Sequence, residues 1–278
     1  MDLVTDQVRH AESPRWAEGR LWFSDTHDRA VKTVEPDGTV RRVADTPERP
    51  SGLGHFSDGR WLLVTSRSDT LHWLEQGRLT LACDLGPFTL GHAGDMVVDG
   101  RGRAYISDTG FNHGAGEAPR LGQVLLFTEK DGVRVVAADT NWANGCAVSA
   151  DSSRFFLAET YGERISVFTI HSDGGLSDRR TFAELGTGPD GLCLDADGGL
   201  WVGLPFRSEF AHLDAHGHLD RRVTTRGALA TACALGGEDR RTLFACSVDA
   251  TPENLSRGIL AGGLIESMAV ETPGAGWP

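Results

Sequence analysis

The sequence predicts an all-β protein, a six-bladed β-propeller whose blades are four-stranded antiparallel sheets. Two observations lead to this prediction: short apolar or alternating runs recur along the whole chain, and a similar stretch begins six times, at positions 12, 51, 94, 144, 190 and 231. Units of roughly 40–50 residues that each hold four short strands are typical of propeller blades. Helical periodicity is absent, apart from a single turn expected around 252–256.

Each unit opens with an apolar strand that a turn joins to a second, more apolar strand. The second strands are LWFS (21–24), WLLV (61–64), AYIS (104–107), FFLA (155–158), LWVGL (200–204) and TLFA (242–245). Their length and their β-branched and aromatic content are typical of buried strands. Third and fourth strands are clearest in three units. They are AVKTVE and VRRVAD in the first unit, RISVFTI and RRTFAE in the fourth, and FAHLD and LDRRVTT in the fifth.

The sixth unit contains GILAGG (258–263) and LIESMAV (264–270), while an N-terminal run, DLVTD (2–6), precedes the first unit. We therefore expect residues 3–7 to complete the blade built mainly from 232–270. This exchange closes the ring and removes two sheet edges. No linker or shift in composition interrupts the chain, so 1–278 is expected to be a single domain.

Composition excludes several functional classes. The 27 basic and 39 acidic side chains give a net charge of −12, which argues against nucleic-acid and anionic-membrane surfaces. The 40% hydrophobic content excludes a disordered chain. No apolar leader or long apolar run is present, and five cysteines cannot all pair, so we expect reduced thiols, a cytoplasmic location and a small-molecule partner. The expected assembly is a monomer or a weak homodimer.

The candidate chemistry lies where the six units differ. The opening residues of the inner strands are expected at one rim of the central channel, where Glu12, Asn144 and Asp190 bring oxygen donors from three blades. Two carboxylates in a narrow channel repel each other unless a cation neutralises them. Oxygen ligands favour one hard divalent cation, Ca²⁺ first and then Mg²⁺ or Mn²⁺, with Zn²⁺ a further candidate. Ser51 and Thr231 can add a hydroxyl or hold a water.

The same residues could also have purely structural roles. Asn144-Gly145 and Asp190-Gly191 are also turn sequences, and Glu12 could cap backbone amides. Each residue alone would favour that interpretation. Because three oxygen donors occupy the same position in three different repeats, the metal site is the favoured interpretation.

A family resemblance spans the whole chain. AESPRW, GDMVVD, ANGCAVSAD, GPDGLCLDADGGLWVG and the closing AGWP (275–278) resemble the senescence-marker-protein (regucalcin)/gluconolactonase/luciferin-regenerating-enzyme family. The resemblance implies a six-bladed propeller that binds one divalent metal in the channel and hydrolyses lactones or, in some members, organophosphates. By motif it implies metal ligation by Glu12, Asn144 and Asp190, with Asp190 also the catalytic residue.

The sequence departs from this family in the third unit, where members commonly carry Asn and this chain has Gly94. The change removes a contact to metal or substrate and enlarges the pocket. His92 falls where related lactonases present an Arg, and an imidazole is a weaker anion clamp. The expected substrate contacts at this mouth are His92, Asp108, Asn112, His113, Glu159 and Tyr161. His92 as a loop residue, and Asp108 and Glu159 as solvated strand ends, remain alternatives.

The predicted function is metal-dependent hydrolysis of a lactone. The metal would polarise the carbonyl, and a water activated by Asp190 or by the metal would attack it. Because a bound cation lowers the pKa of Asp190, direct attack by Asp190 is a competing mechanism. The alternatives are another metal-dependent reaction on the same fold (organophosphate or ester hydrolysis, a lyase or an isomerase) and a non-enzymatic propeller that binds calcium or a small molecule. Buried cysteines are expected in the core.

Overall fold

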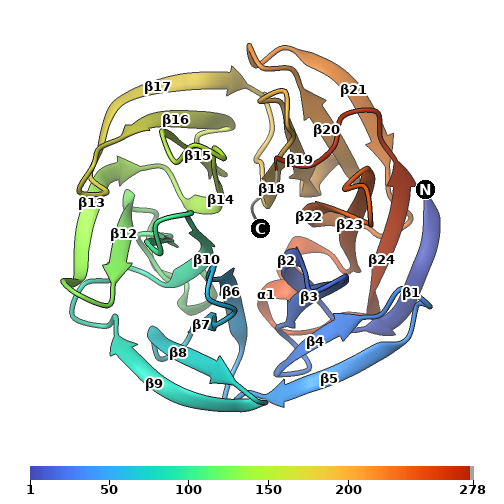
Figure 1. Ribbon diagram of the computed structural model, residues 1–278, viewed down its shortest axis with the longest axis horizontal. Helices are drawn as coiled ribbons and strands as arrows, with labels where there is room; N and C mark the ends of the chain where they lie inside the picture. The colour runs from blue at the N-terminus through green and yellow to red at the C-terminus, as the bar shows by residue number, and fades with distance from the viewer. Residues whose placement is uncertain (276–278) are drawn as a thin grey trace.

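The computed structural model describes residues 1–275 and confirms the six-bladed β-propeller. Six four-stranded antiparallel sheets surround a central axis, each with its first strand innermost (Figure 1). Most of the AGWP motif, residues 276–278, lies outside the described residues. None of the described helices has the length and hydropathy needed to cross a membrane.

The blades follow one another along the chain. The first three are β2 (Ala11–Ala17), β3 (Arg20–Asp25), β4 (Ala30–Val34) and β5 (Val40–Asp45); β6 (Pro50–His55), β7 (Trp61–Thr65), β8 (Thr70–Glu75) and β9 (Arg78–Asp84); and β10 (Ala93–Val98), β11 (Ala104–Asp108), β12 (Gly122–Thr128) and β13 (Gly132–Thr140). The next two are β14 (Ala143–Val148), β15 (Arg154–Glu159), β16 (Arg164–Ile170) and β17 (Leu176–Glu184); and β18 (Leu192–Leu194), β19 (Leu200–Leu204), β20 (Glu209–Leu213) and β21 (Leu219–Thr224).

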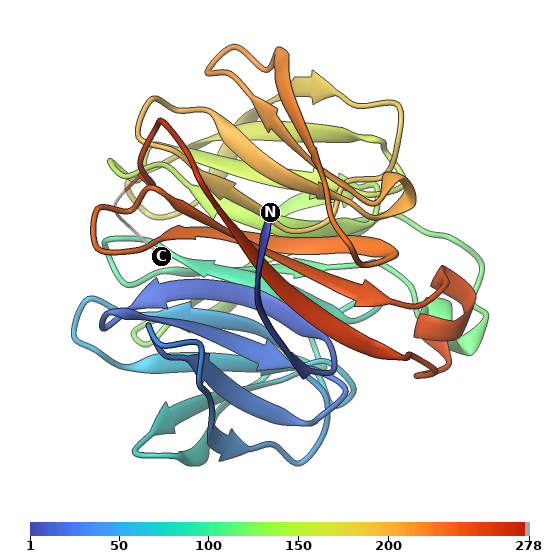
Figure 2. The same cartoon turned by 90° about the vertical axis from the view of Figure 1, so that its right-hand side faces the viewer.

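The sixth blade is closed by the N-terminus, as the sequence predicts. Its strands run β22 (Leu229–Gly236), β23 (Thr242–Asp249), β24 (Gly262–Ala269) and β1 (Asp2–Val8), and β1 pairs antiparallel with β24. Figure 2 shows β1 beside β24 on the outside of the ring. The sequence-based assignment of GILAGG as a separate strand is wrong: a loop that follows α1 (Pro252–Ser256) occupies residues 258–261, and only the last two glycines belong to β24. The helical turn expected at 252–256 is confirmed.

The hydrophobic core lies between the blades. The described residues form six clusters of buried side chains, each shared by two neighbouring blades. Second strands such as β7 and β19 are buried along their whole length because both faces pack against other blades. This explains why those strands consist of continuous apolar runs rather than an alternating pattern.

The inner strands enter the ring through bulges and close contacts. The pairing of inner and second strands shifts register directly after the rim in five blades, at Glu12/Arg15, Pro50/Leu53, Ala93/Met96, Ala143/Cys146 and Ala230/Ala232. In the fifth blade Asp190 N donates to Gly203 O at 2.9 Å, so Asp190 lies in the sheet as well. A Cβ on Gly145 would lie 2.4 Å from Asp190 O, so glycine lets these two inner strands approach. Asn144-Gly145 and Asp190-Gly191 are therefore strand entries rather than turns.

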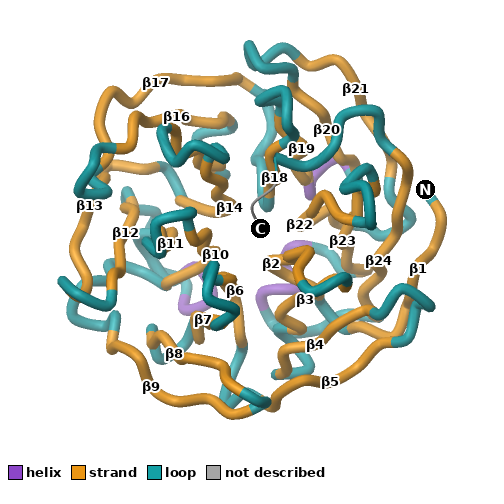
Figure 3. The backbone as a smooth tube through the Cα atoms, viewed as in Figure 1, coloured by secondary structure: helices purple, strands orange, loops and turns teal. Residues whose placement is uncertain are grey.

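One face of the disc carries the short helices. Figure 2 shows α1 and the 3₁₀ turn η1 (His113–Ala115) projecting from the same side, and Figure 3 shows the loops between the strands in teal. A second 3₁₀ turn, η2 (Pro205–Arg207), follows β19. Pro205 and Leu255 both line the opening of the central channel.

Candidate functional site

The rim residues singled out from the sequence converge on one cavity. An opening of about 410 Å³ leads into the channel, within the size range of small-molecule sites. Its lining includes Glu12, Ser51, Gly94, Asn144 and Asp190, which come from five different blades. A smaller cavity beneath it is again lined by Glu12, Asn144 and Asp190, so these side chains form the floor.

The two floor carboxylates are held in an environment that disfavours their charge. Burial, the Asp95 carboxylate and a weaker opposing hydrogen bond from Thr231 set the pKa of Glu12 at about 8. Burial, then Glu12 and then Asp95 raise the pKa of Asp190 well above its usual value. Buried acids of this kind without cationic partners are typical of functional sites.

Asn144 is positioned by its own neighbours. Its Nδ2 lies 3.1 Å from Thr160 Oγ1, and Thr160 in turn donates to the Pro189 carbonyl at 2.8 Å. The Asn144 side chain also donates a hydrogen bond to Asp190. Since both contacts use the amide nitrogen, the carbonyl oxygen of Asn144 is the atom left to face a ligand.

The sequence analysis missed Asp95, which completes the acidic floor. Asp95 Oδ2 accepts a hydrogen bond from Cys146 N at 3.2 Å, Ser13 donates to Oδ1, and Arg15 Nη2 lies 3.3 Å from Oδ1. Arg15 therefore compensates Asp95, while no Arg or Lys of residues 1–275 pairs with Glu12. The sequence did contain a sign of this residue, an acidic side chain directly after Gly94 in GDMVVD. Asp95 lies one position beyond the residue that opens each inner strand in the other blades, and the bulge in β10 turns its side chain toward the channel.

His10 is a second residue that the sequence analysis missed. Its Nε2 lies 2.7 Å from Glu12 Oε1, although the contact lacks the alignment of a regular hydrogen bond. Burial lowers the pKa of His10 to about 4, so the imidazole is neutral at pH 7. His10 therefore leaves the charge on Glu12 uncompensated.

The donor set fits a hard divalent cation. The described residues contain no group of three or more His, Cys, Asp and Glu side chains arranged to hold a metal ion. A cation here would instead meet two carboxylates and one amide, from Glu12, Asp190 and Asn144. Oxygen ligands of this kind suit Ca²⁺, Mg²⁺ or Mn²⁺ better than metals that favour thiolate or imidazole.

The walls of the opening differ in character. One side is apolar, with Trp142, Phe206, Leu229 and Leu255. Basic and imidazole groups occupy other parts of the lining, at His10, His27, Arg49 and His92. A ligand can thus bring a polar group to the floor while its hydrocarbon part packs against the apolar wall.

Of the expected substrate contacts, His92 lines the opening. Its Nδ1 lies 3.6 Å from Asp69 Oδ2, and the hydrogen bond and charge of Asp69 raise the pKa of His92. Asn112 contacts His92 from the loop that carries η1. His113 and Tyr161 pack on Trp142, with ring centroids 5.9 Å and 5.0 Å away. Neither His113 nor Tyr161 is part of the lining of the opening.

Asp108 and Glu159 differ from the sequence-based expectation, since both are fully buried and turned away from the opening. Asp108 accepts hydrogen bonds from the backbone amides of Leu90, Gly91 and Gly110 at 2.7–3.0 Å. Glu159 accepts one from Asn141 N at 2.7 Å and pairs with Arg164 and Arg179. These carboxylates hold the loops that enter the inner strands of their own blades, β10 and β14, and they do not line the opening.

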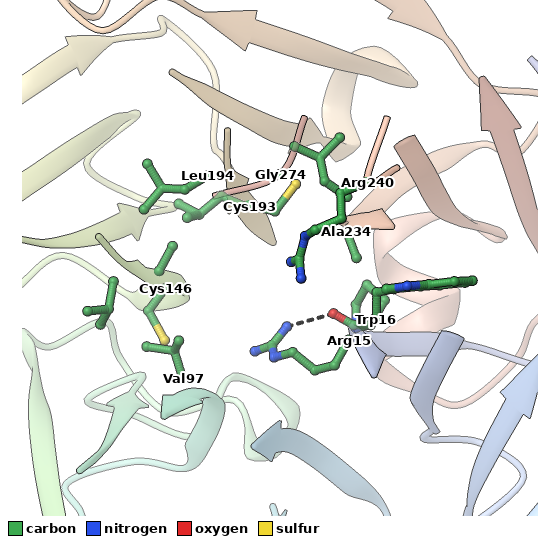
Figure 4. A pocket seen from close by; sticks show the side chains of 14 residues that line it. Arg15, Trp16, Val97, Cys146, Cys193, Leu194, Ala234, Arg240 and Gly274 are labelled. Carbon is green, nitrogen blue, oxygen red and sulfur yellow. Dashed lines mark hydrogen bonds between the residues drawn. The ribbon is translucent and has the colours of Figure 1, made fainter. Parts of the chain in front are cut away.

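The channel continues below the acidic floor to a second, narrow cavity of about 40 Å³. Figure 4 shows Arg15 and Arg240 directed toward its centre, with Cys146 and Cys193 on the wall. All five cysteines are free thiols, and Cys146, Cys233 and Cys246 are buried, as expected from the sequence. The acidic floor thus separates an open mouth from a small basic cavity.

The fold and the site define the class of this protein: a six-bladed β-propeller with an acidic, oxygen-rich floor in its central channel. Comparison with known families is consistent with this class: the model described as SMP-30/Gluconolactonase/LRE-like region matches residues 10–249, so the chain belongs to this family. The family resemblance predicted from the sequence is thereby confirmed.

Relatives match over nearly the whole chain at low identity. The protein is 26% identical to regucalcin of Homo sapiens, over 95% of this chain and 92% of the relative. It is 27% identical to the 6-deoxy-6-sulfogluconolactonase of Pseudomonas putida, over 96% and 93%. Among solved structures, a luciferin-regenerating enzyme superimposes with a TM-score of 0.84 at 16% identity, covering 98% of this chain and 95% of that one. The calcium-binding protein regucalcin of Agrobacterium tumefaciens gives 0.82 at 20%, covering 98% and 94%. These two structural matches show the fold.

Proposed function

We propose that the protein hydrolyses a lactone at the acidic floor of the channel, with one divalent cation, Ca²⁺ first, held by Glu12, Asn144 and Asp190. The observation that supports this most directly is the pair of buried carboxylates without an Arg or Lys partner in the described residues, at the base of an opening of about 410 Å³. Family membership and the name of the Pseudomonas putida relative favour a lactone as the substrate.

The chain's own residues have distinct tasks in this proposal. The apolar wall around Trp142 and Leu229 binds the carbon skeleton of the lactone and excludes water from it. A bound divalent cation supplies Lewis-acid stabilisation of the charge that develops on the carbonyl oxygen. Asp190, oriented by the hydrogen bond from Asn144, accepts the proton of the attacking water. Direct attack of Asp190 on the carbonyl carbon remains the competing route for the same geometry.

Two measurements test the proposal. Metal analysis of the purified protein by mass spectrometry should find about one divalent cation per chain. A proton-release assay over sugar and aromatic lactones should then show turnover that a chelator abolishes and that added Ca²⁺, Mg²⁺ or Mn²⁺ restores. Turnover that persists with no bound metal would contradict the metal site, and no turnover of any lactone would contradict the reaction.

Gly94 favours a second candidate, hydrolysis of a bulkier ester or an organophosphate on the same floor. Gly94 lines the opening without a side chain. The same proton-release assay with aryl esters and phosphotriesters separates the two candidates by their relative kcat/KM.

A further inference from the structure

Arg49 lies at the mouth of the channel, and the charges of Arg29 and Arg67 are close enough to act on it. Arg49 lines the opening, and no ion pair or hydrogen bond of its guanidinium to another described residue is present. Burial lowers the pKa of Arg49, and the nearby charges of Arg67 and Arg29 lower it further. In a protein of net charge −12, three cations close enough to repel one another are an unfavourable arrangement that a bound anion would relieve.

The surroundings of Arg49 are suited to an oxyanion. A methyl group built on Gly258 would lie 2.7 Å from Arg49 Nη2 and 3.7 Å from His27 Cδ2, so both side chains reach the turn after α1. The carboxylate of Asp25, on the same side of the ring, is already held by Lys32 Nζ at 2.8 Å and by His10 N at 2.9 Å. The guanidinium of Arg49 therefore has free donors in the same opening as the acidic floor.

We infer that Arg49 binds an anionic group of the substrate, a carboxylate, sulfonate or phosphate, at the end remote from the lactone carbonyl. This inference depends on the proposed lactonase function and specifies its substrate class. Arg49 is a specificity-determining residue in this arrangement, because a guanidinium matches the geometry of an oxyanion with two parallel N–H donors.

The test compares gluconolactone, which is neutral, with glucarolactone, which carries a carboxylate. The wild-type protein should prefer glucarolactone, and Arg49→Gln should lower the ratio of the two kcat/KM values by about 10- to 100-fold, mainly through KM. Arg101→Gln removes the same charge from an exposed turn at the opposite face and should leave the ratio unchanged. Equal ratios in wild type and Arg49→Gln, with both lactones hydrolysed, overturn the inference and leave the proposed function standing.

A binding measurement distinguishes failure of the anion-site inference from failure of the proposed lactonase function. Glucarate is titrated into both proteins while the fluorescence of Trp142, in the lining, is followed. Binding of glucarate that is lost in Arg49→Gln, without hydrolysis of either lactone, would support the anion site and overturn the lactonase proposal. Absence of both Arg49-dependent binding and hydrolysis would overturn both.

A separate observation concerns two thiols below the floor. Cys193 Sγ in β18 lies 3.6 Å from Cys233 Sγ in β22, and Cys233 Sγ lies 3.4 Å from the Trp201 carbonyl oxygen. Cys193 is half-buried and lines the narrow cavity of about 40 Å³, which has room for a molecule slightly larger than water. Arg240, on the same cavity, is close enough to interact with the charge of a Cys193 thiolate.

The two thiols are unequal. Burial and the neighbouring Cys193 raise the pKa of Cys233 well above its usual value. Cys193 lines the cavity and Cys233 does not, so Cys193 is the thiol that a small oxidant in the cavity can reach. An accessible thiol beside a cation, with a second thiol in contact, is the arrangement found in reversible cysteine oxidation sites.

We propose that Cys193 and Cys233 form a site of reversible oxidation by hydrogen peroxide. The Cys193 thiolate attacks one peroxide oxygen, which gives a sulfenic acid and releases hydroxide. The Cys233 sulfur then attacks the sulfenic sulfur, an S–S bond forms and the oxygen leaves as water. Two thiols and one peroxide thus give one disulfide and two waters, and the bond joins the inner strands of the fifth and sixth blades.

Peptide mapping of the peroxide-treated native protein tests this directly. Cleavage after Lys and Arg places each cysteine in its own peptide, with Cys193 in 181–207 and Cys233 in 227–240. We expect a cross-linked pair 2 Da lighter than the sum of the two peptides, in a monomer, and its loss on treatment with dithiothreitol. The disulfide should also raise the thermal midpoint, since it constrains the unfolded chain.

Variants identify the order of events. Cys193→Ser should abolish oxidation, and Cys233→Ser should leave a Cys193 sulfenic acid that dimedone traps. Cys146→Ser, on the same cavity wall, should retain the cross-link. Wild-type peptides that remain reduced, or peroxide products spread equally over Cys146 and Cys193, overturn the proposal without requiring any variant to fold.

Discussion

Glu12 and Asp190 enter the channel from the first and fifth blades, and burial, followed by the Glu12 carboxylate, raises the pKa of Asp190. Neither side chain forms an ion pair with an Arg or Lys among residues 1–275, and Arg15 is engaged with Asp95. The floor therefore holds two acids that are stable together only when protonated or when a cation lies between them. The predictions below follow from this relationship and from the closure of the ring.

The first prediction is that Asp190→Ala removes the metal and the activity while the fold remains. One carboxylate and its charge are lost, so the bound cation should fall well below one per chain and turnover should fall at least about 100-fold. Metal analysis, lactone turnover and circular dichroism measure the three properties. Asp131→Ala, in an exposed turn, is the matched control. Wild-type metal content and turnover in Asp190→Ala would refute the assignment.

The second prediction concerns the stability of the metal-free protein. The pKa of Glu12 is about 8 when folded and near 4.5 when unfolded, so between these values the folded protein retains a proton that the unfolded chain has lost. Glu12 alone thus makes the free energy of unfolding decrease as the pH rises from about 4.5 to 8, by at most about 1.4 kcal/mol per pH unit. Burial lowers the pKa of His10 and of His27 below 6.5, which gives the opposite trend at lower pH, so the net decrease is expected between about pH 6.5 and 8. Denaturant titrations with a chelator present measure it.

Glu12→Gln should flatten this pH dependence, because its amide does not titrate. Bound metal should also reduce the pH dependence of the free energy of unfolding, since the cation replaces the proton between the carboxylates. Glu238→Gln, at the surface, should retain the wild-type slope. A wild-type slope in Glu12→Gln would mean that Glu12 is ionised in the metal-free floor.

The third prediction concerns ring closure. Deletion of residues 2–8 removes β1, exposes the edge of β24 and takes away Val8, which is 4% exposed in the core between the first and sixth blades. We expect the thermal midpoint to fall by several degrees or more, since β24 loses a hydrogen-bonded partner and the core loses a buried side chain. Differential scanning calorimetry measures the midpoint. An unchanged midpoint would show that the ring is held closed without β1.

The blades and the rim could be predicted from the sequence because both depend on local repeats. A short apolar run marks each second strand, and the repeat places Glu12, Asn144 and Asp190 at the same phase. The assignment of 258–263 as a strand failed because its glycines and apolar residues follow a helical turn, and the pairing with β23 begins only at Gly262.

The other members of the site depend on tertiary contacts that a repeat does not record. Asp95 reaches the floor because a bulge turns it inward, and His10 belongs to the loop between β1 and β2 rather than to a rim position. Asp108 and Glu159 occupy the expected strand ends, but their carboxylates satisfy backbone amides of neighbouring loops. The position of a residue within the repeat gives its height along the channel axis, but it does not give the direction in which its side chain points.

The last prediction concerns Gly94, the position at which the chain differs from the family pattern. A Cβ on Gly94 would lie 3.0 Å from Ser107 Oγ, so a side chain fits after a small movement of that hydroxyl, and Gly94 does not adopt a positive φ. Gly94→Asn should add an oxygen donor at the opening, tighten metal binding and lower the turnover of bulky lactones relative to small ones. Gly94→Ala adds the Cβ without the amide, so it should narrow the opening and leave metal affinity unchanged. Calorimetric metal titration and turnover of a small and a bulky lactone in the three proteins separate these effects. If Gly94→Asn behaved like Gly94→Ala in the metal titration, the third blade would contribute no ligand to the cation, and the coordination would depend on Glu12, Asn144 and Asp190 alone.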